Sequence, residues 1–304
     1  MIQVADRIEG VEEYYFSKKL REIAQLRRSG KDILNLGIGS PDLPPAPRVI
    51  DKLQGLSDRD NVHGYQSYKG IPRLREAFSS WYKKYYAVTL HAEKEILPLI
   101  GSKEGIMHIS MTYLNPGDEV LIPNPGYPAY AATARLTGAL TRYYDLDEST
   151  HWQPNLEELA KKDLSKVKLM WINYPNMPTG TKATNTLFRD LKEFGETYEI
   201  LICNDNPYSF ILNKNPLSLL SQGLSEYTLE LNSLSKSHNM AGWRVGMVAA
   251  KETHINNILK FKSNMDSGMY LPIQEAAVEA LALNDDWYAE QNRIYESRRE
   301  VVLE

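Results

Sequence analysis

The sequence predicts an α/β fold in which a mostly parallel, seven-stranded sheet is covered by helices on both faces. Three observations support this prediction. Short apolar runs recur along the chain, segments with helical spacing lie between them, and polar or glycine-containing motifs follow the apolar runs directly. Because ligands bind at the carboxyl ends of parallel strands, these motifs are expected to meet at one edge of the sheet.

The N-terminal part of the chain predicts two helices joined by an irregular loop. Residues 11–30 have the apolar spacing of an amphipathic helix. Residues 37–45 are rich in proline and glycine, which is typical of a stiff turn. Gly70 and Pro72 begin a second helix that is predicted to reach about Tyr86, since proline is tolerated in a first turn.

From residue 95 onward, candidate strands and helices alternate. The predicted strands are residues 95–100, 119–122, 139–144, 167–172, 199–203, 227–232 and 245–250. The predicted helices are residues 102–113, 127–137, 155–162, 184–198 and 252–265, followed by a helical pattern over 271–304 that breaks near 284–286. This alternation is typical of βα units, whose strands run parallel.

The composition is that of a soluble globular protein, with 42% hydrophobic and 24% charged residues. A net charge of −4 argues against a general affinity for nucleic acid or anionic membranes. There is no signal-peptide pattern, and no apolar run approaches the roughly 20 residues that span a bilayer. The single cysteine, Cys203, excludes an internal disulfide. These features predict a cytoplasmic protein.

The segment between the last two predicted strands carries the residues that best indicate chemistry. Lys236 lies at a strand-to-loop junction, where lost hydration favours the neutral amine that attacks aldehydes. Ser233, Ser235 and Arg244 supply hydroxyls and a planar cation suited to a phosphate. A cofactor with both an aldehyde and a phosphate fits this set, namely pyridoxal 5′-phosphate (PLP).

The spacing of these residues resembles a known signature. Ser-x-Ser-Lys alone is usually an ordinary loop, but here Gly242-Trp-Arg-Val-Gly246 follows at a fixed distance. The combined pattern resembles the cofactor-lysine signature of class I/II aminotransferases, which are fold type I PLP-dependent enzymes. The resemblance implies that Lys236 forms the Schiff base with PLP. It also implies that Arg244, Ser233 and Ser235 hold the cofactor phosphate.

Two further turns match the family in order. Gly101-Ser102-Lys103 follows a predicted strand and matches the phosphate cradle, although many turns between a strand and a helix look similar. Tyr127 follows the next predicted strand, at the position where the family places an aromatic ring against the pyridine. A turn tyrosine without function is the alternative for Tyr127.

The motif Asn204-Asp-Asn-Pro-Tyr208 also resembles the family. Asp205 matches the aspartate that pairs with the pyridine nitrogen, and Tyr208 matches a tyrosine that donates to the phenolic oxygen of PLP. A carboxylate at that position keeps the nitrogen protonated, so that the ring can accept electrons. Without the resemblance, Asp205 could simply cap a following helix.

One motif departs from the family pattern. The segment from Asn173 to Gly180 resembles the family's Asn-x-Pro-x-Asn-Pro-Thr-Gly, but Met177 replaces the asparagine that donates to the phenolic oxygen. A thioether cannot donate a hydrogen bond. Either Asn176 or Asn173 takes this role, or the oxygen has one donor fewer.

Two N-terminal segments carry the remaining assignments. The Gly-x-Pro-Asp-like loop implies that a backbone amide near Gly39 meets the substrate carboxylate. Tyr65 matches the tyrosine that reaches the phosphate in a neighbouring subunit's site, which implies a homodimer. The alternative is that Tyr65 packs beside the start of the following helix.

The resemblance also predicts how the chain is divided. Residues 1–45 are expected to form an N-terminal arm and small-domain segment, residues 46–275 the large PLP-binding domain, and residues 276–304 a connecting helix. The rest of the small domain, with the family's second arginine for the substrate carboxylate, is expected beyond Glu304. The sequence is therefore expected to be a truncated chain with an incomplete small domain.

The predicted function is that of an aminotransferase, with no metal. It exchanges an amino group between an amino acid and a 2-oxo acid by double displacement through the imine of Lys236, which also moves the Cα proton. Two alternatives remain open, a PLP-dependent β-lyase of the same fold and a non-catalytic PLP-binding domain. The sequence does not identify the amino donor.

Overall fold

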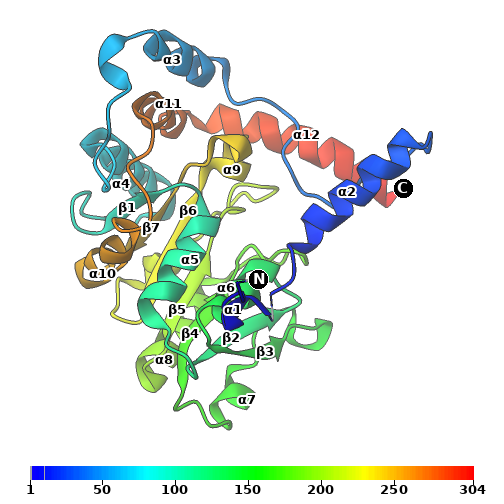
Figure 1. The fold of residues 1–304 in the computed structure, drawn as a ribbon, viewed down its shortest axis with the longest axis vertical. Helices are drawn as coiled ribbons and strands as arrows, with labels where there is room; N and C mark the ends of the chain where they lie inside the picture. The colour runs from blue at the N-terminus through cyan, green and yellow to red at the C-terminus, as the bar shows by residue number, and fades with distance from the viewer. Residues whose placement is uncertain (1, 10) are drawn as a thin grey trace.

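A seven-stranded sheet runs through the centre of the computed structural model, which describes residues 2–9 and 11–304 (Figure 1). The strands are β1 Ile96–Leu99, β2 Glu119–Asn124, β3 Leu140–Asp145, β4 Val167–Ile172, β5 Leu201–Asp205, β6 Thr228–Ser233 and β7 Gly246–Ala250. Their order in the sheet is β1-β7-β6-β5-β4-β2-β3. Only β7 runs antiparallel to its neighbours, so the predicted mostly parallel sheet and its seven strands are confirmed.

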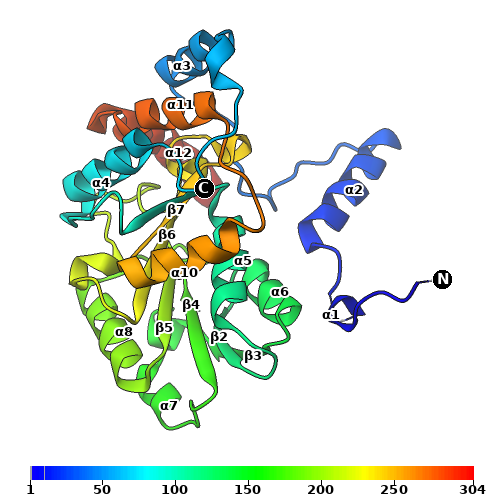
Figure 2. The same ribbon diagram turned by 60° about the vertical axis from the view of Figure 1, so that its left-hand side comes forward.

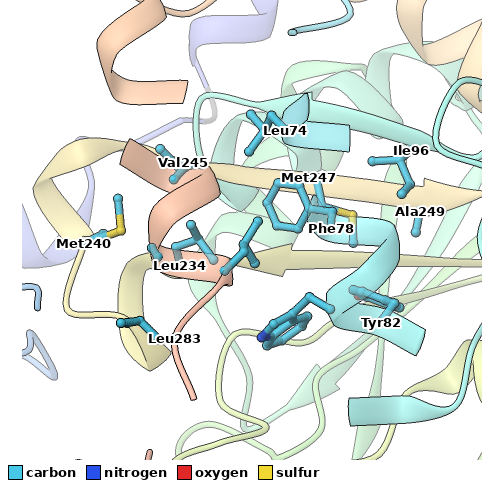
Figure 3. Close-up of a cluster of buried hydrophobic side chains, with 14 of the residues drawn as sticks. Leu74, Phe78, Tyr82, Ile96, Leu234, Met240, Val245, Met247, Ala249 and Leu283 are labelled. Carbon is cyan, nitrogen blue, oxygen red and sulfur yellow. The ribbon is translucent and has the colours of Figure 1, made fainter. Parts of the chain in front are cut away.

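Helices cover both faces of this sheet because successive side chains along each strand point to opposite sides. On β7, Val248 packs among residues of α5 (Ser102–Tyr113) and α10 (Glu252–Lys262). Its neighbours Met247 and Ala249 point the other way, against α4 (Pro72–Tyr86). Figure 3 shows these side chains with those of α4. Burial on both faces explains why these strands read as continuous apolar runs.

The other helices complete the two layers and the N-terminal region. They are α1 Asp6–Glu9, α2 Tyr15–Arg28, α3 Pro47–Ser57, α6 Pro128–Leu136, α7 Leu156–Ala160, α8 Asn185–Tyr198, α9 Leu234–Ser237, α11 Leu271–Leu281 and α12 Asp285–Leu303. Short 3₁₀ helices lie at η1 Asp60–Val62, η2 Glu148–Thr150, η3 Leu219–Gln222 and η4 Ala241–Trp243. Among the described residues, no helix is both long enough and apolar enough to cross a bilayer.

Two helices differ from the sequence-based expectation. Helix α3 was not predicted, because it begins at a proline and contains Gly55; it buries Val49 and packs on α11. Helix α2 forms within the predicted range 11–30, but none of its residues is buried. Figure 2 shows α2 set apart from the sheet and its covering helices. Its apolar residues therefore find no core within this chain.

The position of β5 decides where one polar residue lies. The strand ends at Asp205, two residues beyond the predicted run 199–203, because Asn204 and Asp205 continue the pairing with β4 and β6. The residues that follow form turns, so Asp205 caps no helix. Its carboxylate is instead buried at the carboxyl end of the sheet.

Candidate active site

A cavity of about 370 Å³ opens where the parallel strands β4, β5 and β6 end. Most residues assigned from the sequence line this cavity: Ser102, Lys103, Tyr127, Asn173, Asp205, Tyr208, Ser233, Ser235, Lys236 and Arg244. Tyr130, Met177, Pro207 and Ala241 complete the lining. The structure therefore brings together side chains that lie more than a hundred residues apart, as expected for the carboxyl edge of a parallel sheet.

Lys236 enters the cavity from α9, a short helix that begins directly after β6. The Ser233 hydroxyl caps this helix by accepting from the Ser235 N–H at 3.1 Å. Burial, and to a smaller extent the charge of Arg244, lowers the pKa of the Lys236 amine. Its Nζ donates to the Gly39 carbonyl and lies 5.8 Å from the centre of the Tyr208 ring. This lysine is thus held in place and biased toward its nucleophilic, neutral form.

A cradle for an anion lies beside Lys236. Ser102 and Lys103 are the first residues of α5, where backbone N–H groups have no partner within the helix. Burial, and repulsion from Arg244, which lines the same cavity, lower the pKa of Lys103. A bound phosphate would relieve this repulsion.

Gly101 is required by the geometry of this cradle. Its φ is +80°, and a Cβ at this position would overlap the Arg244 guanidinium. Replacing Gly101 with alanine is expected to push the flexible Arg244 side chain away and to raise the Kd for PLP at least about tenfold. The measurement is titration of apoenzyme with PLP.

The matched control for this prediction is Gly223→Ala. Gly223 has a φ of +88°, but a Cβ there meets no atom within 4 Å. Both substitutions place alanine in the left-handed region, so both should lower stability by about 1 kcal/mol. Equal Kd values for PLP in the two variants would show that Gly101 does not shape the anion cradle.

Asp205 provides the observation that tests whether PLP fits this site. Tyr130 donates to its Oδ2 at 3.0 Å, whereas Oδ1 is buried and has no partner among the described residues. Burial raises the pKa of the Asp205 carboxyl to about 7, against the lowering effect of the neighbouring Tyr130 and Ser102 hydroxyls. An unsatisfied buried carboxylate oxygen calls for a donor, and the protonated nitrogen of a pyridine ring supplies one. The residues present therefore fit the cofactor.

Aromatic residues line the cavity around this carboxylate. Burial raises the pKa of Tyr127 well above its usual range, and that of Tyr208 to about 12, so both phenols are neutral donors near pH 7. Tyr130 stacks on Trp171, with ring centres 5.0 Å apart, and this holds the hydroxyl that meets Asp205. Sequence reasoning missed Tyr130, although it lies one helical turn after Tyr127.

Tyr14 is a second residue that sequence reasoning missed. It lies just before α2, and its ring centre is 3.9 Å from the Lys103 ammonium. Hydrogen bonding with Tyr14 also contributes, after burial, to the raised pKa of Tyr127. The start of the N-terminal arm therefore reaches the cavity through Tyr14, while α2 itself remains exposed. The sequence did not indicate the contact of Tyr14 with Lys103, because Tyr14 belongs to the apolar pattern of the predicted helix 11–30.

The two asparagines considered as substitutes at Met177 have different surroundings. Asn173 lines the cavity; its Nδ2 donates to the Asp205 carbonyl at 2.6 Å, and its Oδ1 accepts from the Met177 N–H. Asn176 lies outside the cavity lining, and its Oδ1 accepts from Thr179 at 2.8 Å. The Met177 side chain itself lines the cavity.

Gly39 and Tyr65 lie outside the cavity lining for different reasons. The loop of Gly39 approaches the cavity only through its contact with Lys236, and Asp42 in the same loop pairs with Arg298 of α12 at 2.8 and 3.0 Å. The Tyr65 side chain is 95% exposed and does not line this cavity.

With this geometry established, comparison with known proteins decides the family. Residues 31–304 match the family described as aminotransferase class I and II. The chain belongs to this family. It is therefore a PLP-dependent aminotransferase, and the cofactor and enzyme class predicted from the sequence are confirmed. The comparisons favour transamination over the lyase and the non-catalytic alternatives.

Curated relatives and solved structures agree with this assignment. An LL-diaminopimelate aminotransferase of Dehalococcoides mccartyi is 39% identical over 100% of this chain and 79% of its own length. One from Moorella thermoacetica is 38% identical over 100% and 78%. Apo-BacF from Bacillus subtilis superposes with a TM-score of 0.93 at 32% identity, covering 98% of this chain and 77% of its own.

Proposed function

We propose that Lys236 binds PLP covalently through its amine and, once the amino group of the substrate has displaced it from the cofactor, moves the proton at the substrate Cα as general base and acid. When bound, PLP accepts the electron pair released as the Cα–H bond breaks. The observation that carries this proposal is that the cavity places the Lys236 amine together with the anion cradle and the unsatisfied Asp205 carboxylate. Substitution of Lys236 by alanine tests it.

The other residues of the site have separate tasks under this proposal. Gly101, Ser102, Lys103, Ser233, Ser235 and Arg244 hold the phosphate, and Asp205 holds the proton of the pyridine nitrogen. Tyr127 covers one face of the ring and excludes water, while Tyr208 donates to the phenolic oxygen. Asn173 is better placed than Asn176 to supply the second donor, because it lines the cavity and has one amide hydrogen beyond the bond to Asp205.

We further propose LL-diaminopimelate as the amino donor. The support is that relatives 38 and 39% identical over the whole chain carry the name LL-diaminopimelate aminotransferase. This donor has an amino group and a carboxylate at both ends, so one end can react while polar groups bind the other. Gly39 would contact the reacting carboxylate through its backbone.

A panel of donors tests the substrate. With 2-oxoglutarate as acceptor and glutamate formation as the readout, LL-diaminopimelate is expected to show the highest kcat/KM. Its meso isomer, which differs at one centre, should be at least about tenfold worse, because a polar group at the distal end would be left without its partners. Faster turnover of aspartate than of LL-diaminopimelate would contradict the assignment.

The same proposal covers assembly, location and domains. In a homodimer, the partner subunit would cover the exposed Tyr65 and helix α2, which has no buried residue in this chain. Tyr65 would then contact the phosphate in the neighbouring subunit's site. Sedimentation of the PLP-bound enzyme should therefore give a dimer. We also propose a cytoplasmic location and the division into an arm (1–45), a large domain (46–275) and a connecting helix (276–304).

A further inference from the structure

Three ionisable side chains meet behind the phosphate cradle. Glu104 and His108 lie one turn apart on α5, and Asp266 lies in the turn after α10. His108 Nε2 is 3.4 Å from Glu104 Oε1 and 3.6 Å from Asp266 Oδ2. His108 is fully buried, and neither of its ring nitrogens has a hydrogen-bond partner among the described residues. The proposed mechanism uses none of these groups.

Glu104 connects this cluster to the cradle. Its Oε2 accepts from the Ile100 N–H at 2.5 Å and so closes the turn that contains Gly101, Ser102 and Lys103. Burial works to raise the pKa of Glu104, but the neighbouring His108 and Asp266 side chains and the bond from the Ile100 N–H outweigh it and lower the pKa. Glu104 therefore remains an anion that can hold the Ile100 N–H firmly.

Asp266 connects the cluster to the rest of the molecule. Its Oδ1 accepts from the Lys262 ammonium at 2.6 Å, and both side chains are almost fully buried. Two residues later, Gly268 packs so closely on Gln66 and Ser67 that a Cβ would overlap their carbonyl groups. The turn after α10 is thus fixed to α10 on one side and to the segment beside Tyr65 on the other.

We propose that Glu104, His108 and Asp266 form a buried clamp that positions the phosphate cradle. Glu104 sets the shape of the turn from residue 100 to residue 104, and His108 and Asp266 hold Glu104 against α10. All three are positioning residues, since Glu104 bonds to the backbone of the cradle, and His108 and Asp266 lie within 4.8 Å of Glu104 and do not line the cavity. The proposal rests on the proposed function only in that PLP binds at this cradle.

The charge of the cluster favours a clamp over a cation site. The net charge of the cluster is about −1 when His108 is neutral, because the carboxylates of Glu104 and Asp266 are offset by the single ammonium of Lys262. A divalent cation would reverse this to about +1 in a buried space, which is costly. Direct contact among these side chains, at 3.4 and 3.6 Å, needs no added charge.

Substitution of His108 tests the clamp. His108→Leu is expected to raise the Kd for PLP about tenfold, while kcat and KM at saturating PLP stay within about twofold. The matched control is His254→Leu, because His254 is also buried and lies on α10, but it bonds to Tyr113, at the opposite end of α5 from the cradle. Both variants should lose thermal stability, and only the first should lose PLP affinity.

A milder variant and a metal analysis complete the test. Asp266→Asn keeps the shape of the side chain and should raise the Kd in the same direction, even if His108→Leu fails to fold. An unchanged Kd in folded Asp266→Asn, or equal Kd values for the two histidine variants, would overturn the clamp. One equivalent of a transition metal in dialysed holoenzyme, lost in His108→Leu, would overturn it in favour of a cation site.

These outcomes are separable from those of the proposed function. If Lys236 does not bind PLP, the wild-type protein lacks the covalent cofactor absorbance. If the clamp is wrong, the wild-type protein binds PLP normally, and the clamp variants bind it equally well.

Discussion

The Lys236→Ala variant is expected to lose transamination, with kcat at least about 10³-fold lower. Alanine removes both the amine that binds PLP and the base that moves the Cα proton. Because the cradle around Gly101 and Arg244 is untouched, the variant should still bind PLP through its phosphate. The measurements are glutamate formation and the absorbance of the covalently bound cofactor, and both signals should vanish.

Lys103→Ala is the matched control for this prediction. Lys103 lines the same cavity, and burial and Arg244 lower its pKa as they lower that of Lys236. It differs in its position at the start of α5, beside the ring of Tyr14. The control should bind PLP more weakly and still show the covalent absorbance. Retained turnover in Lys236→Ala would rule out the proposed role of Lys236.

Asp205→Asn is expected to act in opposite directions on activity and on stability of the apoenzyme. The folded pKa of about 7 lies above the ordinary value of 3.8, so the folded state holds this proton more tightly than the unfolded state. The ionised carboxylate therefore costs about 4 kcal/mol above pH 7. Asparagine removes that cost but leaves a buried amide hydrogen unbonded, for about 1–3 kcal/mol.

The net gain for the apo variant is about 1–3 kcal/mol, and its pH dependence identifies the cause. Wild-type apoenzyme should lose stability relative to Asp205→Asn as the pH rises from about 4 to about 7, and the difference should stay constant above that. Urea unfolding at several pH values measures this. If Asp205→Asn is less stable than wild type at pH 8, burial of the ionised Asp205 carboxylate does not destabilise the apoenzyme, and the account is contradicted.

The activity of Asp205→Asn should fall by at least about 10²-fold. A neutral amide cannot keep the pyridine nitrogen protonated, so the ring accepts electrons less readily. Because the amide retains the shape of the carboxylate, PLP should still bind and KM should change less than kcat. Loss of activity together with gain of apoenzyme stability is typical of a residue retained for chemistry.

Much of the fold was predictable because a buried parallel sheet has a strong local signal. Strands buried on both faces, such as β1, β5, β6 and β7, are short buried runs, whereas the edge strand β3 is largely exposed. The order of the strands was not predictable, because the pairing of β1 with β7 joins segments about 150 residues apart and leaves no local pattern. Helix α3 was missed because proline and glycine weaken its signal, although α11 stabilises it by packing.

The site was predictable wherever a motif directly follows a strand, as for Ser102, Asp205 and Lys236. Residues that reach it from elsewhere were not. Tyr14 arrives from the N-terminal arm, and Tyr130 acts through a hydroxyl on an otherwise buried helix face. The cluster of Glu104, His108 and Asp266 depends on how α5 and α10 pack, which no local pattern encodes.

The most direct test of the central claim is to locate the bond between PLP and the protein. Reducing the PLP-bound enzyme with borohydride makes that bond permanent, and mass spectrometry of its peptides then identifies the modified residue. We expect the pyridoxyl group on the peptide that contains Lys236, at one equivalent per chain. A pyridoxyl group on Lys103, or no modified peptide from enzyme that is active with PLP, would contradict the account.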